Sequence, residues 1–397
     1  MVVVVKMVIR IHLHPRRLDY YDFGSAHFIW NNQFVSDSDA DMLEKLMDMA
    51  EKNRCLSPVS LKSITPLEDV IANMLRAETQ LSFDNSQIMT FVDFCTRDAV
   101  DHLLSVLVHE PQKRIALPLP NWHFWREKNA ISTFNFFTAL NEDQLVSGFK
   151  KTAALGNIGA LILVSPAVPL MYIPSKAACQ EIDKIAQHYG IAVIIDDVLR
   201  GIQPVGERDS IGTHFSNPFI VEGFSKRFGD GVLSDISYVV KPKNEERVKA
   251  RNPSDRVQIA QKAVIAFALE KTYSHYSPLV IEELERRNKA FDEGLCTYSD
   301  AVVSRPSSSH LTSLVEIPAE CHLDSDQFCD GAYRNDGVLA APMSQFYPKT
   351  FAPYSVPREI TKRFRITTGR MSEPYVRAGA EILGYELKKL VMAGRTR

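Results

Sequence analysis

Four residues whose side chains can do chemistry stand close to apolar runs of the sequence. Lys226 comes shortly after PFIVEGF, Asp196 directly after IAVII, Trp122 shortly after RIALPLP, and Arg365 within RFRITTG. A lysine offers a nucleophilic amine on a long stem, and a buried carboxylate holds a proton or a positive charge. An aromatic face packs flat against another ring, and an arginine grips a carboxylate with two parallel hydrogen bonds. The four types together suit covalent amine chemistry on a substrate that carries a carboxylate.

Each of these residues also has an ordinary structural interpretation. An aspartate at the end of a buried strand is often a helix N-cap, and a lysine after a strand is usually a solvated surface residue. A single tryptophan is usually part of a core, and an arginine between apolar neighbours can pair with a buried carboxylate. A further alternative is that Asp196 and Asp197 belong to a metal-binding or phosphoryl-accepting site.

The elements that must position these residues alternate between strand and helix patterns. Runs such as ALILV and IAVII are apolar on both faces, which is typical of strands covered by helices on both sides of a parallel sheet. The predicted strands are residues 87–91, 114–117, 160–164, 192–195, 219–222 and 237–240. The predicted helices between them are residues 97–108, 142–152 and 175–188. This alternation predicts a three-layer α/β domain with a mostly parallel sheet.

The pattern changes after residue 243. Residues 244–290 are expected to be mostly helical, strands are expected near 301–303 and 311–317, and residues 374–393 form an amphipathic helix pattern. We therefore expect an N-terminal arm over residues 1–35, a large α/β domain over 36–292 and a smaller α+β domain over 293–397. The basic first 18 residues are expected to form an ordered strand or arm rather than a transit peptide, because they are rich in β-branched residues and lack serine.

The order of the motifs resembles the class I/II aminotransferases, a family of fold-type I enzymes that depend on pyridoxal 5′-phosphate (PLP). The resemblance runs from about residue 22 to the C-terminus. GFSKRFGDG resembles the family's lysine segment, and IIDDVLRG resembles its strand-end aspartate segment. Four further segments match in the family's order, namely LPLPNWHFW, SPAVPL, GVLAAPMSQF and FRITTG.

The resemblance implies a role for each site residue. Lys226 would be the catalytic lysine that holds PLP as an internal aldimine, Asp196 would keep the pyridine nitrogen protonated, and Trp122 would stack on the ring. Arg365 would bind the carboxylate of the substrate. The phosphate would lie at the N-terminus of the helix that follows Cys95. The remaining cofactor contacts are assigned to Thr96, Arg97 and Ser225.

The sequence departs from the family at four contacts to the cofactor. Val168 stands where the family has an asparagine, and Leu199 where it has a tyrosine, both of which bond the phenolic oxygen. Ser234 replaces an arginine on the phosphate, and SLKSI replaces the stretch that normally supplies a tyrosine to the partner subunit. Substitutes for the phosphate charge could come from Arg97, Arg200 or Arg227, and substitutes at the phenolic oxygen from His123 or Tyr172.

Composition narrows the remaining classes of function. The chain has 397 residues and a formal net charge of −2, which gives no reason to expect nucleic acid as a partner. The six cysteines are scattered without a CxxC pair, which favours a reducing, cytoplasmic location over a disulfide framework or a zinc site. No apolar run is long enough to span a bilayer, and the GxGxxG, GxxxxGK[ST] and HExxH motifs are absent.

These observations predict a PLP-dependent transferase of amino acid metabolism. Aminotransferase-type chemistry is the first expectation, with an amino acid and a keto acid as substrates and a homodimer as the assembly. One alternative is an atypical PLP enzyme that eliminates, cyclises or oxidises an amino acid in a specialised biosynthetic pathway. Another is a degenerate, non-catalytic member of the family. No metal, nucleic acid or membrane partner is expected.

Overall fold

The structure is a computed structural model of the chain. It describes residues 65–395 apart from 82, 93–94, 109, 122–133, 205–207, 225, 227–235, 250–277, 279, 349–355, 370 and 372. The predicted N-terminal arm lies outside the described residues, as does the whole segment from 250 to 277.

The elements of the first part of the chain are α5 (Leu67–Glu78), η2 (Asn85–Gln87), β1 (Ile88–Val92), α6 (Thr96–Leu107), β2 (Arg114–Leu119), β3 (Phe134–Thr138), α8 (Glu142–Ala153), β4 (Ile158–Val164), α9 (Lys176–Tyr189), β5 (Ala192–Asp196), η4 (Arg200–Ile202), η5 (Ile211–His214), β6 (Phe219–Gly223) and β7 (Ile236–Val240). Those of the last part are β8 (Val302–Ser304), β9 (Thr312–Glu316), α11 (Ser325–Asp336), β10 (Ala341–Pro342), η6 (Met343–Phe346), η7 (Arg358–Ile360), β11 (Arg363–Thr367) and α12 (Glu373–Arg395).

Seven strands form a central sheet in the order β1-β7-β6-β5-β4-β2-β3. The pairs β2–β3, β2–β4 and β5–β6 are parallel, whereas β7 runs antiparallel to both β6 and β1. All six predicted strands are present, and the predicted fold class is confirmed. The strand that the sequence pattern missed is β3, FNFFT, in which Asn135 interrupts the apolar run.

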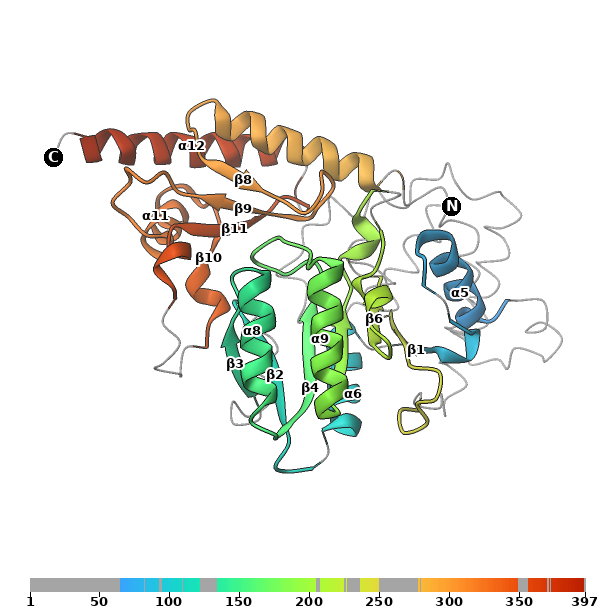
Figure 1. The fold of residues 1–397 in the computed structure, drawn as a ribbon. Coiled ribbons are helices and arrows are strands. Elements are labelled where there is room, and N and C mark those ends of the chain that lie inside the picture. Colours follow the sequence, from blue (N-terminus) through green and yellow to red (C-terminus); the bar gives the residue numbers. More distant parts are fainter. Residues whose placement is uncertain are drawn as a thin grey trace, which may run out of the picture. The chain divides into compact units, whose positions relative to one another are not determined.

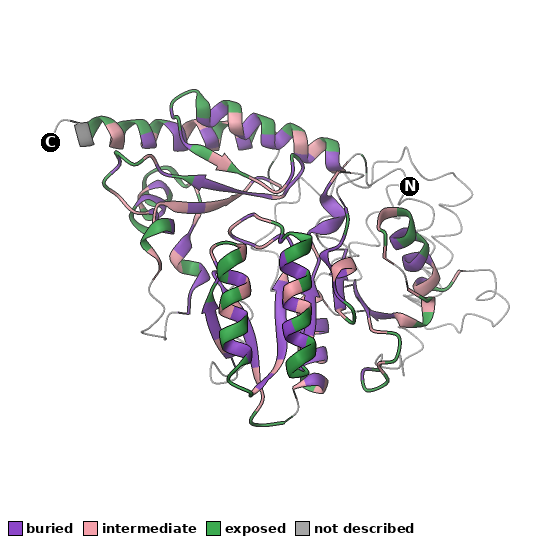
Figure 2. Ribbon diagram, in the orientation of Figure 1, coloured by how far each residue is buried: buried purple, intermediate pink, exposed green. Residues whose placement is uncertain are grey.

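Helices α8 and α9 pack side by side along strands β2 to β4 (Figure 1). Each begins at a residue whose side chain caps the first turn: Asn141 accepts from the N–H of Gln144, and Ser175 from the N–H of Ala178. Helix α9 ends at Gly190, whose φ of 64° is the left-handed conformation that glycine adopts without a steric cost. The buried stripes of both helices face the strands, which are buried along most of their length (Figure 2).

A hydrophobic cluster joins α5 to β1, β6 and β7. Its largest members include Leu67, Ile71, Leu75, Phe224 and Tyr238, all buried. Helix α6 packs on β6 and β7 through apolar residues spaced three or four apart, from Ala99 to Leu107. This packing fixes the N-terminus of α6 relative to the end of β6.

The C-terminal part contains a four-stranded sheet in the order β10-β11-β9-β8, and its three strand pairs are antiparallel. One face packs on α11, α12 and the helical residues 281–296, through side chains such as Val315, Phe328, Phe364 and Leu383. The predicted helix over 374–393 is therefore present. The helical prediction fails at residues 244–249, which form turns held by Lys241 Nζ on the carbonyl of Glu245 at 2.9 Å.

By contact, the chain divides into two compact units. One comprises residues 1–107, 194–201 and 205–280, and the other residues 108–193, 202–204 and 281–397. The domain boundaries expected from the sequence, at residues 35 and 292, remain predictions. Among the described helices, none is both long and apolar enough to cross a membrane.

Candidate functional site

Asp196 and Lys226 lie at the ends of two neighbouring parallel strands. Asp196 is the last residue of β5 and pairs with Val221 of β6, and Lys226 follows the end of β6 by three residues. Burial raises the pKa of Asp196 to about 7, while the N–H of Val198, 3.2 Å from Oδ1, and the positive charge of Lys226 act in the opposite direction. A buried carboxylate of this kind suits a cationic partner, because pairing offsets the cost of burying the charge.

The N-terminus of helix α6 carries Thr96 and Arg97. The N–H groups of Asp98 and Ala99 donate to the carbonyl of Cys95, and the Asp98 carboxylate accepts the N–H of Cys95 at 3.2 Å. The N–H groups of Thr96 and Arg97 therefore stand in the first turn, where helices present N–H groups to anions. This is the position that the sequence predicted for the phosphate.

Gly223 brings the end of β6 against Thr96. A Cβ built on Gly223 would lie 2.5 Å from Thr96 Oγ1 and 3.2 Å from the carbonyl of Ile236. Only a residue without a side chain allows this approach. The sequence prediction included Thr96 and Lys226 but overlooked Gly223, although the glycine stands in an otherwise bulky strand.

These residues fit PLP. Lys226 would provide the amine, the buried Asp196 lacks an arginine partner in the described part of the chain, and the first turn of α6 has N–H groups that would face a phosphate. The fold places all three groups within one compact unit. The predicted site residues Ser225 and Trp122 lie outside the described residues, as do Arg227, His123 and Ser234.

A buried ionic network lies next to Asp196 and was not predicted. Arg200 is 1 % exposed and bonds Glu222, and its NH1 lies 3.3 Å from Glu78 and 3.2 Å from the carbonyl of Arg208. Arg200 Nε is also 3.5 Å from Asp197 Oδ2. The charge of Arg200 is thus paired with buried carboxylates of the protein itself. This pairing argues against Arg200 as a substitute for the arginine that the family resemblance expects at the phosphate. Glu222, an acidic residue in a fully buried strand, was the visible signal in the sequence.

Arg365 belongs to the other unit and lies on β11. It pairs with Leu314 of β9, and Thr367 pairs with Thr312, so these side chains share one face of the small sheet. The opposite face, with Phe364 and Val315, is the one packed on the helices. Thr312 Oγ1 lies 3.5 Å from Met171 Sδ, which shows that the face of Arg365 is turned toward the Ala167–Tyr172 turn.

Arg365 contacts an aromatic ring, and hydrogen bonds fix the end of its strand. Its guanidinium carbon lies 5.1 Å from the centre of the Phe346 ring, a cation–π geometry. Asn288 donates to the carbonyls of Ser308 and His310 and accepts from the hydroxyl of Thr368, at 2.7, 2.8 and 2.6 Å. Asn288 thereby ties the end of β11 to the loop before β9.

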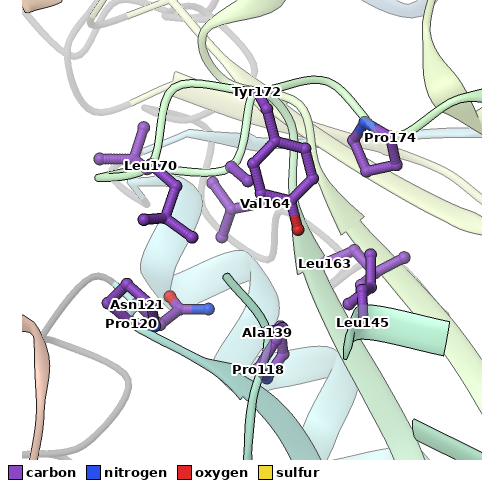
Figure 3. Close-up of a pocket in the computed structure, with 12 residues that line it drawn as sticks. Pro118, Pro120, Asn121, Ala139, Leu145, Leu163, Val164, Leu170, Tyr172 and Pro174 are labelled. Carbon is purple, nitrogen blue, oxygen red and sulfur yellow. The ribbon is translucent and has the colours of Figure 1, made fainter. Parts of the chain in front are cut away.

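The Ala167–Tyr172 turn lines a small pocket together with Asn121 (Figure 3). The pocket measures about 20 Å³, which is room for one water molecule rather than for a substrate. Val168 is buried here, and the Tyr172 hydroxyl points toward Leu163. Burial, with Glu142 nearby, raises the pKa of Tyr172 to about 12.

No group of three or more His, Cys, Asp or Glu side chains in the described part of the chain is arranged to hold a metal ion. The alternative of a metal or phosphoryl site at Asp196 and Asp197 gains no support from the geometry, because Asp197 faces Arg200.

Several solved structures with this architecture are aminotransferases. An aromatic aminotransferase from Pyrococcus horikoshii OT3 has a TM-score of 0.66 and 18% identity, covering 89% of this chain and 92% of its own. This chain has the fold of the fold-type I aminotransferases. N-Succinyldiaminopimelate aminotransferase from Mycobacterium tuberculosis is similar at TM-score 0.65 and 17% identity, covering 89% and 90% of the two chains. A PLP-bound putative aminotransferase from Clostridium difficile 630 is similar at 0.63 and 12%, covering 90% and 89%.

The aminotransferase fold is recognisable here by structure rather than by overall sequence. No protein-family model and no curated protein matches the sequence. The predicted resemblance to a divergent member of the aminotransferase fold is nevertheless confirmed at the level of the fold. Local motifs carried that prediction, because they mark the ends of strands that the fold must place together.

Proposed function

We propose that this protein is a PLP-dependent enzyme that acts on an amino acid, most directly by aminotransferase-type chemistry. The observation that carries the proposal is the placement of Lys226 just after β6 and of the buried Asp196 at the end of the neighbouring strand β5, where the charge of Lys226 acts on Asp196. The N-terminus of α6 lies beside the end of β6 and suits the phosphate. The aminotransferase fold of the chain agrees with this assignment.

When bound, PLP withdraws electrons from the Cα of an attached amino acid. Lys226 would hold the cofactor through its amine and, once displaced by the substrate, would take the proton from Cα. Asp196 would keep the proton on the ring nitrogen. Thr96 and Arg97 would bind the phosphate through their backbone N–H groups. Arg365 would bind the substrate carboxylate with two parallel hydrogen bonds.

Two buried apolar residues bear on the type of reaction. Val168 and Leu199 are 6% and 8% exposed, and neither has a side chain that can bond an oxygen. These are the positions at which the aminotransferase resemblance expects donors to the phenolic oxygen. We therefore retain elimination, cyclisation or oxidation of the amino acid as the second candidate reaction.

The experiment that tests the proposal is cofactor uptake by the purified protein. Wild-type protein mixed with PLP should show a visible absorbance band that survives gel filtration and disappears after borohydride reduction. Lys226→Ala should lose the band, and Lys243→Ala, an exposed lysine paired with Asp84 at 3.0 Å, should retain it. A wild-type protein that takes up no PLP would overturn the proposal and favour a degenerate, non-catalytic member.

The reaction type needs a second measurement. A panel of amino acids is mixed with the loaded protein while keto acid, ammonia and peroxide are followed. Keto acid that forms only when an amino-group acceptor is supplied indicates transamination. Ammonia indicates elimination, and peroxide indicates oxidation. Light scattering on the same sample tests the proposed homodimer.

A further inference from the structure

Three carboxylates stand in a row at the ends of β5 and β6. Asp196 is the last residue of β5, Asp197 follows it directly, and Glu222 stands one residue before the end of β6. The N–H of Asp197 donates to the carbonyl of Val221 at 2.9 Å, which places Asp197 beside Glu222. All three are buried, with exposures of 8%, 1% and 1%. Three buried negative charges at this spacing repel one another unless a cation lies among them.

Arg200 is that cation for two of the three. It bonds Glu222 through Nε, and the same nitrogen lies 3.5 Å from Asp197 Oδ2. The second oxygen of Glu222 accepts the hydroxyl of Tyr238. The NH1 nitrogen of Arg200 pairs with Glu78, and Glu78 also pairs with Arg208. Glu222 is thus bonded at both oxygens within the core.

Asp196 is arranged differently. No arginine pairs with it within the described residues, and its neighbours there are the N–H of Val198 and the charge of Lys226. The charge of Glu222 raises the pKa of Asp196, and the charge of Arg200 lowers that of Asp197. Of the three carboxylates, Asp196 is the one whose negative charge is left for a ligand.

We infer that Arg200 is a positioning residue that offsets the charges of Asp197 and Glu222, so that Asp196 can bind the protonated ring nitrogen of the cofactor. The inference rests on the proposed function. Without Arg200, the charges of Asp197 and Glu222 would act unopposed on Asp196. Asp196 would then keep its proton to higher pH than in the wild type and lose its attraction for the ring.

The test measures the dissociation constant of PLP for the full-length protein between pH 6 and 9, together with the melting temperature. Arg200→Gln should weaken PLP binding by about tenfold or more at pH 7, a loss of about one pKa unit of charge stabilisation. The weakening should diminish toward pH 9, where Asp196 ionises again. Adding Glu222→Gln to Arg200→Gln should restore most of the affinity, because it removes the opposing charge.

Arg208→Gln is the matched control, because Arg208 is a buried arginine of the same network that forms an ion pair with Glu78. It should lower the melting temperature without changing the pH dependence of PLP binding. If Arg200→Gln fails to fold, the pH dependence of PLP binding by Glu222→Gln tests the inference on its own. Its PLP binding should persist to lower pH than that of the wild type, because Asp196 then ionises more readily.

The inference would be overturned if Arg200→Gln weakened PLP binding equally at every pH. It would also be overturned if Glu222→Gln did not extend PLP binding to lower pH, and Arg200 would then be a structural residue. Failure of the proposed function looks different, because the wild-type protein itself would then take up no PLP.

Discussion

The guanidinium of Arg365 lies over the ring of Phe346, with 5.1 Å between its central carbon and the ring centre. The carbonyl of the same Phe346 accepts the N–H of Asn121 at 3.1 Å. Asn121 directly precedes Trp122, the residue expected to stack on the cofactor ring. One residue of η6 thus links the proposed substrate arginine to the segment that supplies the proposed ring-stacking residue.

Arg365→Gln should lower kcat/KM for the amino acid about 100-fold, because a charge-assisted hydrogen bond contributes about 1.5–3 kcal/mol. The kcat/KM of Arg365→Lys should lie between those of the wild type and Arg365→Gln, since lysine keeps the charge but cannot form two parallel hydrogen bonds. PLP binding should be unchanged in both. The control is Arg363→Gln, on the same strand and face but paired with Glu316 at 3.0 Å. If the two glutamine variants lose equal activity, Arg365 has no special role toward the substrate.

Gly223→Ala should weaken both folding and PLP binding, because the new Cβ would meet Thr96 Oγ1. Overpacking of this kind costs about 1–3 kcal/mol of unfolding free energy. Thr96→Ala in the same chain should recover part of that free energy by removing the hydroxyl, which a double-mutant cycle by urea unfolding measures. Gly331→Ala, where the new Cβ meets nothing within 4 Å, should be neutral or stabilising. Additive effects of the two substitutions would show that the close approach does not matter.

The stability of the cofactor-free protein should depend on Asp196. Burial raises its pKa from 3.8 to about 7, so the folded state binds its proton more tightly than the unfolded state. Its contribution to the unfolding free energy is therefore full below about pH 4, falls as the pH rises to about 7 and is constant above. The upper limit of this loss is about 4 kcal/mol, from about 3 pH units at 1.36 kcal/mol each.

His310 has the opposite effect on the pH dependence of stability. Burial lowers its pKa from 6.5 to about 4, so its contribution to the unfolding free energy is lost as the pH falls through that range. The decisive quantity is thus the difference between wild type and Asp196→Asn in urea unfolding at pH 4 to 8. The variation of this difference with pH should shrink when PLP is bound, because a cation beside Asp196 lowers the pKa of Asp196. Asp300→Asn, at an exposed carboxylate, is the control. A difference that does not vary with pH would contradict the expected titration.

The sequence determined the elements and the identity of the reactive residues. Short apolar runs, several of them apolar on both faces, predicted six of the seven strands of the large sheet, since strands buried on both faces need such residues. Strand-end positions marked Asp196 and Lys226, because parallel strands place their carboxyl ends at one edge. The sequence did not reveal β3, whose polar Asn135 breaks the pattern, or the turns at residues 244–249, whose charges resemble those of a solvated helix.

Only the tertiary structure decided which charges are available to a ligand. Arg200 is separated from Glu78 and Glu222 by 122 and 22 residues, so no local pattern could show that its charge is taken up by them. The approach of Gly223 to Thr96 likewise depends on how α6 packs against β6 and β7. Side-chain type is a property of the sequence, whereas desolvation and ion pairing are properties of the packed interior, and these set the charge that Asp196 presents.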